Sequence, residues 1–409
     1  MRTNTRCRIC RRDSLVQYLD FGETPLANAY LTGETLAAPE PCYPLTVFFC
    51  QACGLSQLGV VVDPEVLYSN YVYFTSAMPR VPQHFRDYAH DAVSRFAPRP
   101  DALVVEIGSN DGVLLSAAKE LGVRVLGIDP ARNIAEVANS RGIPTLPEFF
   151  TETLARRIRE EHGPAAVIIA NNVVAHIDDH HDLARGVKTL LADDGAFIFE
   201  APYLVDMFER LSFGTVYHEH LSFLSLRPLR VLFGQHGMEV FDAKTFPVQG
   251  TSLRVWAGHA GVRPVSPTVG EFLRREEALG LHRLDAYRAL ARSIAGLRER
   301  VRTILTGLKA DGKRIVAYGA PAQSNTLLHY FGIGRDLIEY ATEELETKIG
   351  RYTPGTHIPI VHVTEARKNP PDYFLLLAWN YLDAILEKER EFRARGGKFI
   401  LPVGDARIV

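Results

Sequence analysis

Several features that would point to other classes of protein are missing from this sequence. The 409-residue chain has no run of eighteen apolar residues, and no apolar stretch follows its basic first residues, so neither a membrane span nor an export signal is predicted. Its formal net charge is only -2, which gives no attraction toward nucleic acid or an anionic membrane. We therefore expect a cytoplasmic globular protein whose partners are neither nucleic acid nor membrane.

Cysteine is absent beyond residue 53. Four of the five cysteines form two C-x-x-C pairs, which predicts a closed, structural zinc site with four thiolate ligands. The pairs are far apart, so residues 11–49 are expected to fold over the site. Buried cysteines without metal are the alternative, because free cysteines often behave as small hydrophobic residues. The predicted ligands are Cys7, Cys10, Cys50 and Cys53, with Cys42 as a spare thiol.

The dinucleotide fingerprint G-x-G-x-x-G is also absent, which disfavours an NAD-dependent dehydrogenase. In its place, "VVEIGSNDG" puts an acid at a strand end, one glycine in a turn and another at a helix start. Acids at such a turn disfavour a pyrophosphate and suit a cationic ligand such as S-adenosylmethionine. Asp129 follows the next predicted strand, where a carboxylate can accept hydrogen bonds from ribose hydroxyls. A generic dinucleotide-binding turn remains the alternative. The expected cofactor site consists of Glu106, Gly108, Asn110, Gly112, Asp129 and Asn171.

Strand-like and helical segments alternate through most of the remaining chain. The runs "ALVVEIG", "VRVLGID", "AAVIIANNV" and "GAFIFEAPY" are separated by helical segments such as 131–140 and 180–192, which indicates a doubly wound α/β domain. A helix is predicted over 80–100, and residues 237–258 are typical of an antiparallel hairpin at the sheet edge. Residues 268–312 predict one or two amphipathic helices that could hold a dimer interface. A second, smaller α/β unit is expected after residue 312.

The segment "TVYHEHLSF", residues 215–223, gathers polar groups between hydrophobic flanks. A histidine can accept a proton at neutral pH, and a nearby carboxylate can orient its ring, so His220 and Glu219 offer the parts of a general base. If the segment is extended, Tyr217 and Glu219 share one face and the two histidines share the other. Packing or surface roles are the alternative.

Three further histidines follow a predicted strand. His176 lies just past "AAVIIANNV", where doubly wound folds place residues that contact ligands. His180 and His181 come at the start of the next predicted helix and are expected to face solvent. Of the three, only His176 is therefore a candidate for a pocket shared with the 215–223 segment.

Ordered motifs along nearly the whole chain resemble those of one family. They are "CRIC", "LDFGETPLANAYL", "CQACGLSQLG", "YVYFTSAMP", "VEIGSNDG", "NNVVAHI", "VYHEHLSFLS", "VAYGAPAQSNTLL", "GRYTPGTHIPI" and "LLLAWNY". The family is that of the S-adenosylmethionine-dependent sugar C-methyltransferases of deoxysugar and antibiotic biosynthesis. The resemblance implies a zinc-binding domain at 1–66, a Rossmann-like methyltransferase domain at 67–265, a helical linker at 266–311 and a smaller Rossmann-like domain at 312–409 that helps to bind a sugar nucleotide.

The resemblance also implies a reaction. A methyl group would pass from S-adenosylmethionine to a carbon, C-3, next to the ketone of a 4-keto-deoxyhexose linked to a nucleotide such as dTDP. A base forms the enolate and neighbouring donors stabilise its oxygen. The chain would act as a monomer or homodimer, with zinc in a structural role. By this resemblance His220 is the favoured base, and the active-site positions are Tyr71, His176, Tyr217, Glu219 and His220.

The chain departs from the family pattern at two places. Gln323 and Ser324 stand where relatives often have lysine and glycine, which removes a cation that could meet a phosphate. Thr251 stands where relatives often have glycine. Asn325, Lys348 and Arg351 are candidates to compensate, with ordinary surface or capping roles as the alternative. Another keto sugar, another carrier nucleotide, or ligand binding without catalysis therefore remain alternative functions.

Overall fold

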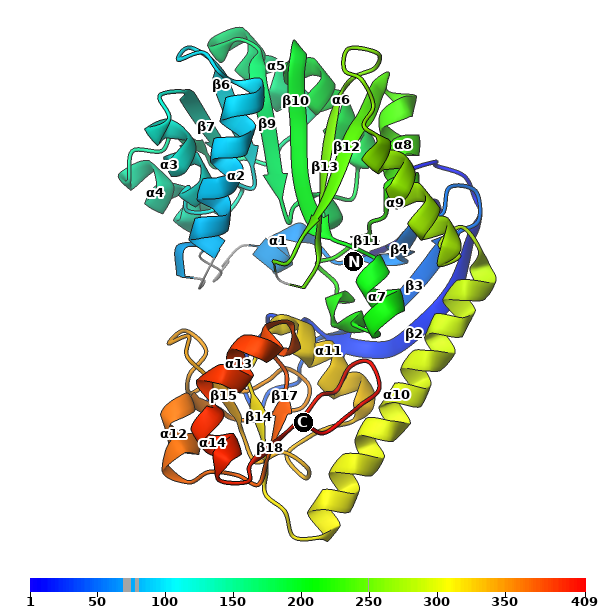
Figure 1. Ribbon diagram of the computed structural model, residues 1–409, viewed down its shortest axis with the longest axis vertical. Coiled ribbons are helices and arrows are strands. Elements are labelled where there is room, and N and C mark those ends of the chain that lie inside the picture. Colours follow the sequence, from blue (N-terminus) through cyan, green and yellow to red (C-terminus); the bar gives the residue numbers. More distant parts are fainter. Residues whose placement is uncertain (69–74, 78–80, 249) are drawn as a thin grey trace.

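A seven-stranded sheet forms the largest part of the computed structural model, which describes residues 1–68, 75–77, 81–248 and 250–409 (Figure 1). The strand order is β12-β13-β10-β9-β6-β7-β8, and all strands are parallel except β13. The expected hairpin is confirmed, since β12 and β13 pair antiparallel at the sheet edge. The strands are β6 Leu103–Ile107, β7 Arg124–Ile128, β8 Thr145–Leu146, β9 Ala165–Asn171, β10 Leu191–Pro202, β12 Met238–Phe246 and β13 Ser252–His259.

Helices cover both faces of this sheet, as the apolar strands predict. Val104 and Ile169 point to one face, where they pack with side chains of α2 and α3. Val105 and Ile168 point to the other face, where α5, α6 and α8 contribute the packing. The helices are α2 Val81–Phe96, α3 Val113–Glu120, α4 Arg132–Ser140, α5 Glu152–His162, α6 His180–Leu190, α7 Val205–Arg210 and α8 Leu226–Gln235, with short 3-10 turns η2 Val174–His176 and η3 Phe213–Thr215.

The N-terminal region is built from strands and turns up to Asp63. Strands β2 and β3 pair antiparallel from Leu15–Cys50 at one end to Pro25–Cys42 at the other. The prediction that residues 11–49 fold over the cysteines was wrong, because this long β arm leads away from them. Strand β11 of the central domain completes the sheet by pairing with β4. The elements are β1 Arg2–Thr3, β2 Leu15–Pro25, β3 Cys42–Cys50, β4 Ser56–Leu58, β5 Val60–Val61, α1 Pro64–Tyr68, η1 Thr75–Ala77 and β11 Ser222–Phe223.

The last part of the chain contains a second parallel sheet, with strand order β16-β15-β14-β17-β18. The smaller α/β unit expected from the sequence is therefore present. It includes one strand, β16, that the hydrophobic pattern did not reveal. The elements are β14 Ile315–Tyr318, α11 Ala322–Phe331, β15 Ala341–Glu343, β16 Ile360–His362, α12 Val363–Lys368, β17 Tyr373–Leu376, η4 Trp379–Tyr381, α13 Leu382–Lys388, α14 Arg390–Ala394 and β18 Lys398–Ile400.

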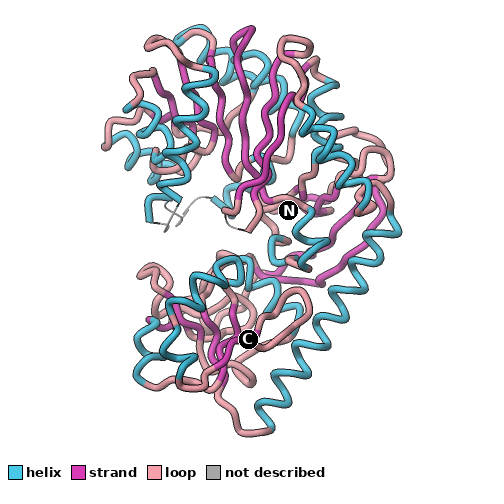
Figure 2. Tube along the Cα trace, viewed as in Figure 1, coloured by secondary structure: helices cyan, strands magenta, loops and turns pink. Residues whose placement is uncertain are grey.

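Two helices connect these sheets, α9 Pro267–Ala278 and α10 Leu284–Ala310, as the 268–312 pattern allows. Figure 2 shows α10 running along one side of the molecule, from the part that contains the seven-stranded sheet to the part that contains the five-stranded sheet. Its buried residues recur every three or four positions and pack on β2 and α11. No helix in the described ranges is both long and apolar enough to cross a membrane.

Candidate active site

The four predicted cysteine ligands lie together at the base of the β arm. Their sulfur atoms are within 4.8 Å of one another, and Cys7 Sγ lies 3.5 Å from Cys53 Sγ, as Cys10 Sγ does from Cys50 Sγ. A tetrahedron of Zn–S bonds near 2.3 Å has edges of about 3.8 Å, so the cluster fits one zinc ion. Cys42 is exposed and outside the cluster. Four cysteines would fill all four positions of a tetrahedral zinc ion and leave none open for water, as in structural rather than catalytic zinc sites.

Both glycines of the "GSNDG" loop are required by its shape. Gly108 has φ +67°, and a Cβ added to it would lie 2.2 Å from Val173 Cγ2. Gly112 caps α3 at φ +78°, where a Cβ would lie 3.2 Å from the side chain of Ile143. A larger residue at either position would be strained by the positive φ; at Gly108 it would also clash, and at Gly112 it would crowd Ile143. The loop therefore brings its backbone close to the carboxyl ends of β6 and β9.

Acceptor groups surround this loop. Asp129 accepts hydrogen bonds from the backbone N–H groups of Asn110, at 2.9 Å, and Ala131, at 3.0 Å, which fixes its carboxylate. Glu106 is only 2% exposed, and burial raises its pKa well above the usual value. Glu106 Oε2 and Asn171 Oδ1 are buried without hydrogen-bond partners. Such orphaned acceptors fit the donor groups and positive charge of S-adenosylmethionine, and a bound cation would restore the charge of Glu106.

A cavity of about 360 Å³ extends from this loop toward the polar 215–223 segment. Its volume is typical of a small-molecule site. The lining includes Glu106 and Asp129 at one end and His176 and Glu219 elsewhere along the wall. Five of the six predicted cofactor residues share this cavity, while Gly112 lies behind the loop as the helix cap. One predicted active-site residue, Tyr71, lies outside the described residues.

The "YHEH" residues form a turn rather than an extended strand. This removes the predicted alternation of faces. Tyr217 Oη and His220 Nε2 lie 3.0 Å apart, and His220 Nδ1 lies 2.7 Å from the Thr215 carbonyl oxygen. The carbonyl can only accept, so Nδ1 carries the proton and Nε2 accepts from the Tyr217 hydroxyl. The ring of His220 is thus oriented by a backbone carbonyl, not by Glu219 as the sequence suggested.

Burial makes His220 a neutral base at physiological pH. It lowers the pKa of His220 to about 4, and it lowers the pKa of His176 well below the usual value. The two rings meet edge to face, with centroids 4.8 Å apart. Burial also raises the pKa of Glu219 to about 7, while a hydrogen bond from Asn28 lowers it. Neutral imidazoles, a phenol and a carboxyl group near ionisation are the components of proton transfer.

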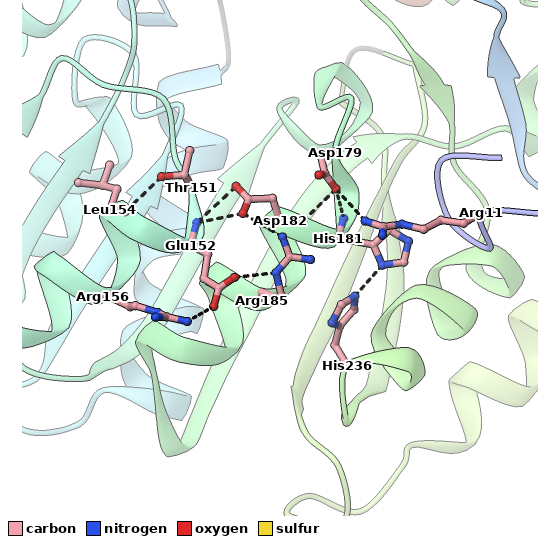
Figure 3. A network of polar contacts seen from close by, with 10 residues as sticks. All are labelled: Arg11, Thr151, Glu152, Leu154, Arg156, Asp179, His181, Asp182, Arg185 and His236. Carbon is pink, nitrogen blue, oxygen red and sulfur yellow. Dashed lines mark hydrogen bonds and ion pairs between the residues drawn. The ribbon is translucent and has the colours of Figure 1, made fainter. Parts of the chain in front are cut away.

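The prediction that His180 and His181 face solvent was wrong, because both are buried. His181 Nε2 lies 2.7 Å from the carbonyl oxygen of Ile9, between the cysteines of the first pair, and its Nδ1 lies 2.7 Å from His236 Nε2. Figure 3 shows this pair beside Asp179, which caps α6 by accepting from the backbone of His181. His181, at the start of α6, therefore joins the central domain to the backbone of the cysteine cluster.

Sequence reasoning missed residues whose partners are distant in the chain. Asn28 Nδ2 donates to Glu219 Oε1 at 2.7 Å. Arg8, beside Cys7, donates to Asp178 Oδ1 at 3.0 Å, and Asp178 lines the cavity. Glu200, another lining residue, forms a buried ion pair with Arg254 at 2.6 Å. Asn28 lies within a motif that resembles the family, but nothing in its local sequence indicates its partner.

Comparisons with known proteins cover almost the entire chain. Residues 7–68 match a family described as "Putative zinc binding domain", residues 82–243 a methyltransferase domain, and residues 247–404 a C-methyltransferase C-terminal domain. The chain is 39% identical over 404 residues to the C-methyltransferase NovU of Streptomyces niveus, an alignment that covers 98% of this chain and 96% of that relative.

Solved structures resemble the chain more weakly. The CcbJ methyltransferase of Streptomyces caelestis is 15% identical, with a TM-score of 0.37 over 48% of this chain and 96% of its own. Magnesium protoporphyrin IX methyltransferase of Synechocystis PCC 6803, with bound SAM, is 14% identical, with a TM-score of 0.34 over 48% of this chain and 89% of its own. TM-scores at this level add nothing to the fold described above. The matched segment 7–68 contains the four cysteines, and the segment 82–243 contains the glycine loop and the "YHEH" turn.

Proposed function

The chain belongs to the C-methyltransferase family and uses S-adenosylmethionine as its methyl donor, and from this premise we propose that its substrate is a nucleotide-linked 4-keto-deoxyhexose. The methylated atom is C-3, the carbon next to the ketone. One observation supports this proposal above the others. A single cavity joins the acceptor groups of the glycine loop to Glu219 and to His176, whose ring contacts the proposed base His220.

His220 is the proposed base. A ketone acidifies the neighbouring carbon, and removal of its proton requires a neutral base. His220 is neutral at pH 7 because burial lowers its pKa, and its basic atom is Nε2 because Nδ1 donates to the Thr215 carbonyl. The Tyr217 hydroxyl bonded to Nε2 is placed to exchange a proton with that atom.

His176 is the proposed donor to the enolate oxygen, and Tyr217 becomes a second donor once His220 Nε2 has taken the substrate proton and no longer accepts from its hydroxyl. Each side chain has a neutral N–H or O–H group, which stabilises a developing negative charge in a buried site. S-adenosylmethionine, when bound, supplies an electrophilic methyl group that the substrate carbon takes by in-line displacement. The residues of the glycine loop would hold that donor at one end of the cavity, with its methyl group directed toward the substrate carbon.

The nucleotide end of the substrate is proposed to contact the C-terminal sheet near the β14–α11 turn. Lys348 Nζ donates to the Ala320 carbonyl oxygen at 2.9 Å, which places a cation at this turn despite the loss of the family lysine. Gln323 cannot replace that charge because its side chain is neutral. Its Oε1 accepts a hydrogen bond from Asn380 Nδ2 at 3.3 Å. Asn325 is buried and donates to the Ala27 carbonyl oxygen, a structural role. The altered turn favours a different carrier nucleotide or keto sugar as the second candidate.

Mass spectrometry tests the proposal directly. Purified protein is incubated with S-adenosylmethionine and a panel of thymidine-diphospho 4-keto-deoxyhexoses, and the sugar fragment is examined for a gain of one methyl group. A gain that is lost in His220→Ala supports both the substrate and the base. Transfer only to sugars on other nucleotides supports the second candidate. Stoichiometric ligand binding without turnover across the whole panel contradicts a catalytic function.

A further inference from the structure

The turn that carries Glu219 is held by parts of the chain outside the central domain. Thr326 of α11 donates through Oγ1 to the Val216 carbonyl oxygen at 2.8 Å. His218 Nε2 lies 3.2 Å from the Tyr43 carbonyl oxygen in β3. Strand β11, which follows the turn, pairs with β4 of the N-terminal sheet. The position of the Glu219 backbone therefore depends on the docking of the N-terminal and C-terminal regions.

Asn28 extends this control to the Glu219 carboxyl group itself. Its Nδ2 donates to Glu219 Oε1 at 2.7 Å, and Glu219 is only 4% exposed and lines the cavity. The residues around Asn28 are also fixed. The Ala27 carbonyl oxygen accepts from Asn325 Nδ2, and the Tyr30 hydroxyl donates to the Ala320 carbonyl oxygen, both at 2.7 Å. Asn28 thus reaches Glu219 from a segment that is hydrogen-bonded to the C-terminal domain on both sides.

The electrostatic surroundings make this contact consequential. Burial raises the pKa of Glu219 to about 7, and the Asn28 amide opposes that shift by donating to the carboxyl group. Other titratable groups in the same cavity are Glu106, Asp129, Glu148, His176, Glu200 and the acidic segment 178–182, and Tyr217, His218 and His220 share its turn. Burial raises the pKa of Glu219, and the hydrogen bond from Asn28 is the interaction that lowers it. A single donor therefore influences whether Glu219 is ionised near neutral pH.

We propose that Asn28 is a positioning residue for Glu219: it fixes the carboxyl group in the cavity and favours the carboxylate form that accepts a hydrogen bond from a hydroxyl group of the substrate. The inference rests on the proposed function, because it takes the cavity that Glu219 lines as the site of the keto-sugar substrate. It also means that the active site is incomplete without a side chain of the N-terminal domain.

The first experiment measures methyl transfer across pH 5.5–9 for wild type, Asn28→Ala and Asn28→Asp. Wild-type kcat rises as Glu219 ionises. Removal of the donor in Asn28→Ala lowers kcat at pH 7 roughly 10- to 100-fold, as expected for a lost hydrogen bond to a charged group, and moves the rising limb to higher pH. Asn28→Asp moves the limb further, because a second carboxyl group opposite Glu219 disfavours its ionisation. The KM for S-adenosylmethionine stays within about 3-fold.

A matched control separates positioning from general disruption of the turn. His218→Asn removes the contact with Tyr43 from the same turn without touching the Glu219 carboxyl group, so its pH profile keeps the wild-type limb. In a Glu219→Gln background, addition of Asn28→Ala lowers kcat by no more than about 2-fold, because the two residues act as a unit. The proposal is overturned if the rising part of the kcat–pH profile stays at the wild-type pH in both Asn28 variants. It is also overturned if Asn28→Ala lowers kcat in the Glu219→Gln background as much as it does in wild type.

The same variants give a readout that does not require the correct substrate. Urea unfolding of wild type, Asn28→Ala, Glu219→Gln and the double variant measures the coupling between the two side chains. A coupling that increases as pH rises through 7 supports the inference, and its absence overturns it. If wild type transfers no methyl group to any keto sugar, the proposed function fails separately, and the unfolding cycle still decides whether Asn28 controls Glu219.

Discussion

Two pairs of histidines in this protein have similar ring geometry and different surroundings. The rings of His176 and His220 have centroids 4.8 Å apart at an interplanar angle of 85°, and those of His181 and His236 have centroids 5.0 Å apart at 63°. In the first pair, His176 lines the cavity and His220 contacts a phenolic hydroxyl. In the second pair, His181 contacts the Ile9 carbonyl oxygen, between Cys7 and Cys10 in the sequence, and its other ring nitrogen faces His236 (Figure 3).

The difference between the pairs lies in what their nitrogen atoms contact. Both ring nitrogens of His181 are engaged in hydrogen bonds, Nε2 with the Ile9 carbonyl oxygen and Nδ1 with His236 Nε2. Its hydrogen-bonding capacity is therefore used in packing. His220 Nε2 faces the Tyr217 hydroxyl, a group that can both give and take a proton. Burial lowers the pKa of both His181 and His220, so a lowered pKa alone does not identify a catalytic histidine.

Removal of zinc should separate the two pairs most strongly. We expect one zinc ion per chain. Removal of the zinc should destabilise the N-terminal region, because its folding loses a zinc-binding free energy on the order of 10 kcal/mol. Cys50→Ser, which removes one ligand, should act in the same direction. The Ile9 contact of His181 should be lost with it. Metal analysis of freshly purified, reduced protein, followed by urea unfolding with and without chelator, checks this. Protein without zinc at the first step would contradict the four-cysteine site.

Substitution of His220, the partner of the cavity-lining His176, should affect catalysis far more than binding. His220→Gln removes the proposed base, so methyl transfer should fall by a factor on the order of 10² to 10⁴, while the Kd for S-adenosylmethionine changes by less than about 3-fold. Single-turnover kinetics and calorimetric titration measure the two quantities. Normal transfer at saturation combined with a large loss of cofactor affinity would reject the assignment of His220.

Substitution of the packing pair should have the opposite profile. His181→Gln leaves the Ile9 carbonyl or His236 without a buried partner, so the free energy of unfolding should fall by about 1–3 kcal/mol. Transfer at saturating substrate should change by less than about 10-fold. Urea unfolding and steady-state kinetics on the same preparation test both expectations. A loss of transfer as large as that of His220→Gln, without loss of stability, would show that the two pairs do not differ in role.

The pH dependence of stability gives the smallest expected signal. His220 has a folded pKa of about 4, below the value near 6.5 expected when unfolded, so the unfolded state binds more protons between these values. Stability therefore rises with pH from about 4 to 6.5, with a slope on the order of 1 kcal/mol per pH unit for this histidine, and its contribution is constant above that window. His220→Gln should reduce the slope of unfolding free energy in this window.

The His220→Gln comparison is needed because other buried groups titrate nearby. Glu219 has a pKa raised to about 7, so its contribution has the opposite sign: stability decreases as pH rises from about 4.5 to 7. The difference between wild type and His220→Gln removes this contribution. Equal slopes in the two proteins would mean that His220 is not buried in the neutral form.

Much of the fold could be predicted because its signals are local. The apolar runs of β6, β9 and β10 indicate strands buried on both faces, and Gly108 and Gly112 mark the turn and the helix start. The two C-x-x-C pairs predict the cysteine cluster because each pair spans a single tight turn. Strand β16 directly follows Pro359, and a proline inside a short apolar run counts against a strand in sequence reasoning.

The candidate site was predictable as a set of residues but not as an arrangement. Motif resemblance pointed to Tyr217, Glu219 and His220, yet the segment is a turn in which the Thr215 carbonyl, rather than Glu219, orients the His220 ring. His180 and His181 were expected at the surface because polar residues usually begin helices there, and docking of the cysteine cluster buries them. Such errors arise where packing between domains overrides a local preference.

The sequence by itself determined the elements, the glycine turn, the cysteine pairs and the residue types of the site, because these depend on neighbours a few positions apart. Only the tertiary structure decided which of those residues meet. Asn28 and Glu219 are separated by 191 positions, and Arg8 and Asp178 by 170. Their contacts exist because the N-terminal sheet continues into β11 of the central domain, and no periodicity or spacing within either segment encodes that pairing.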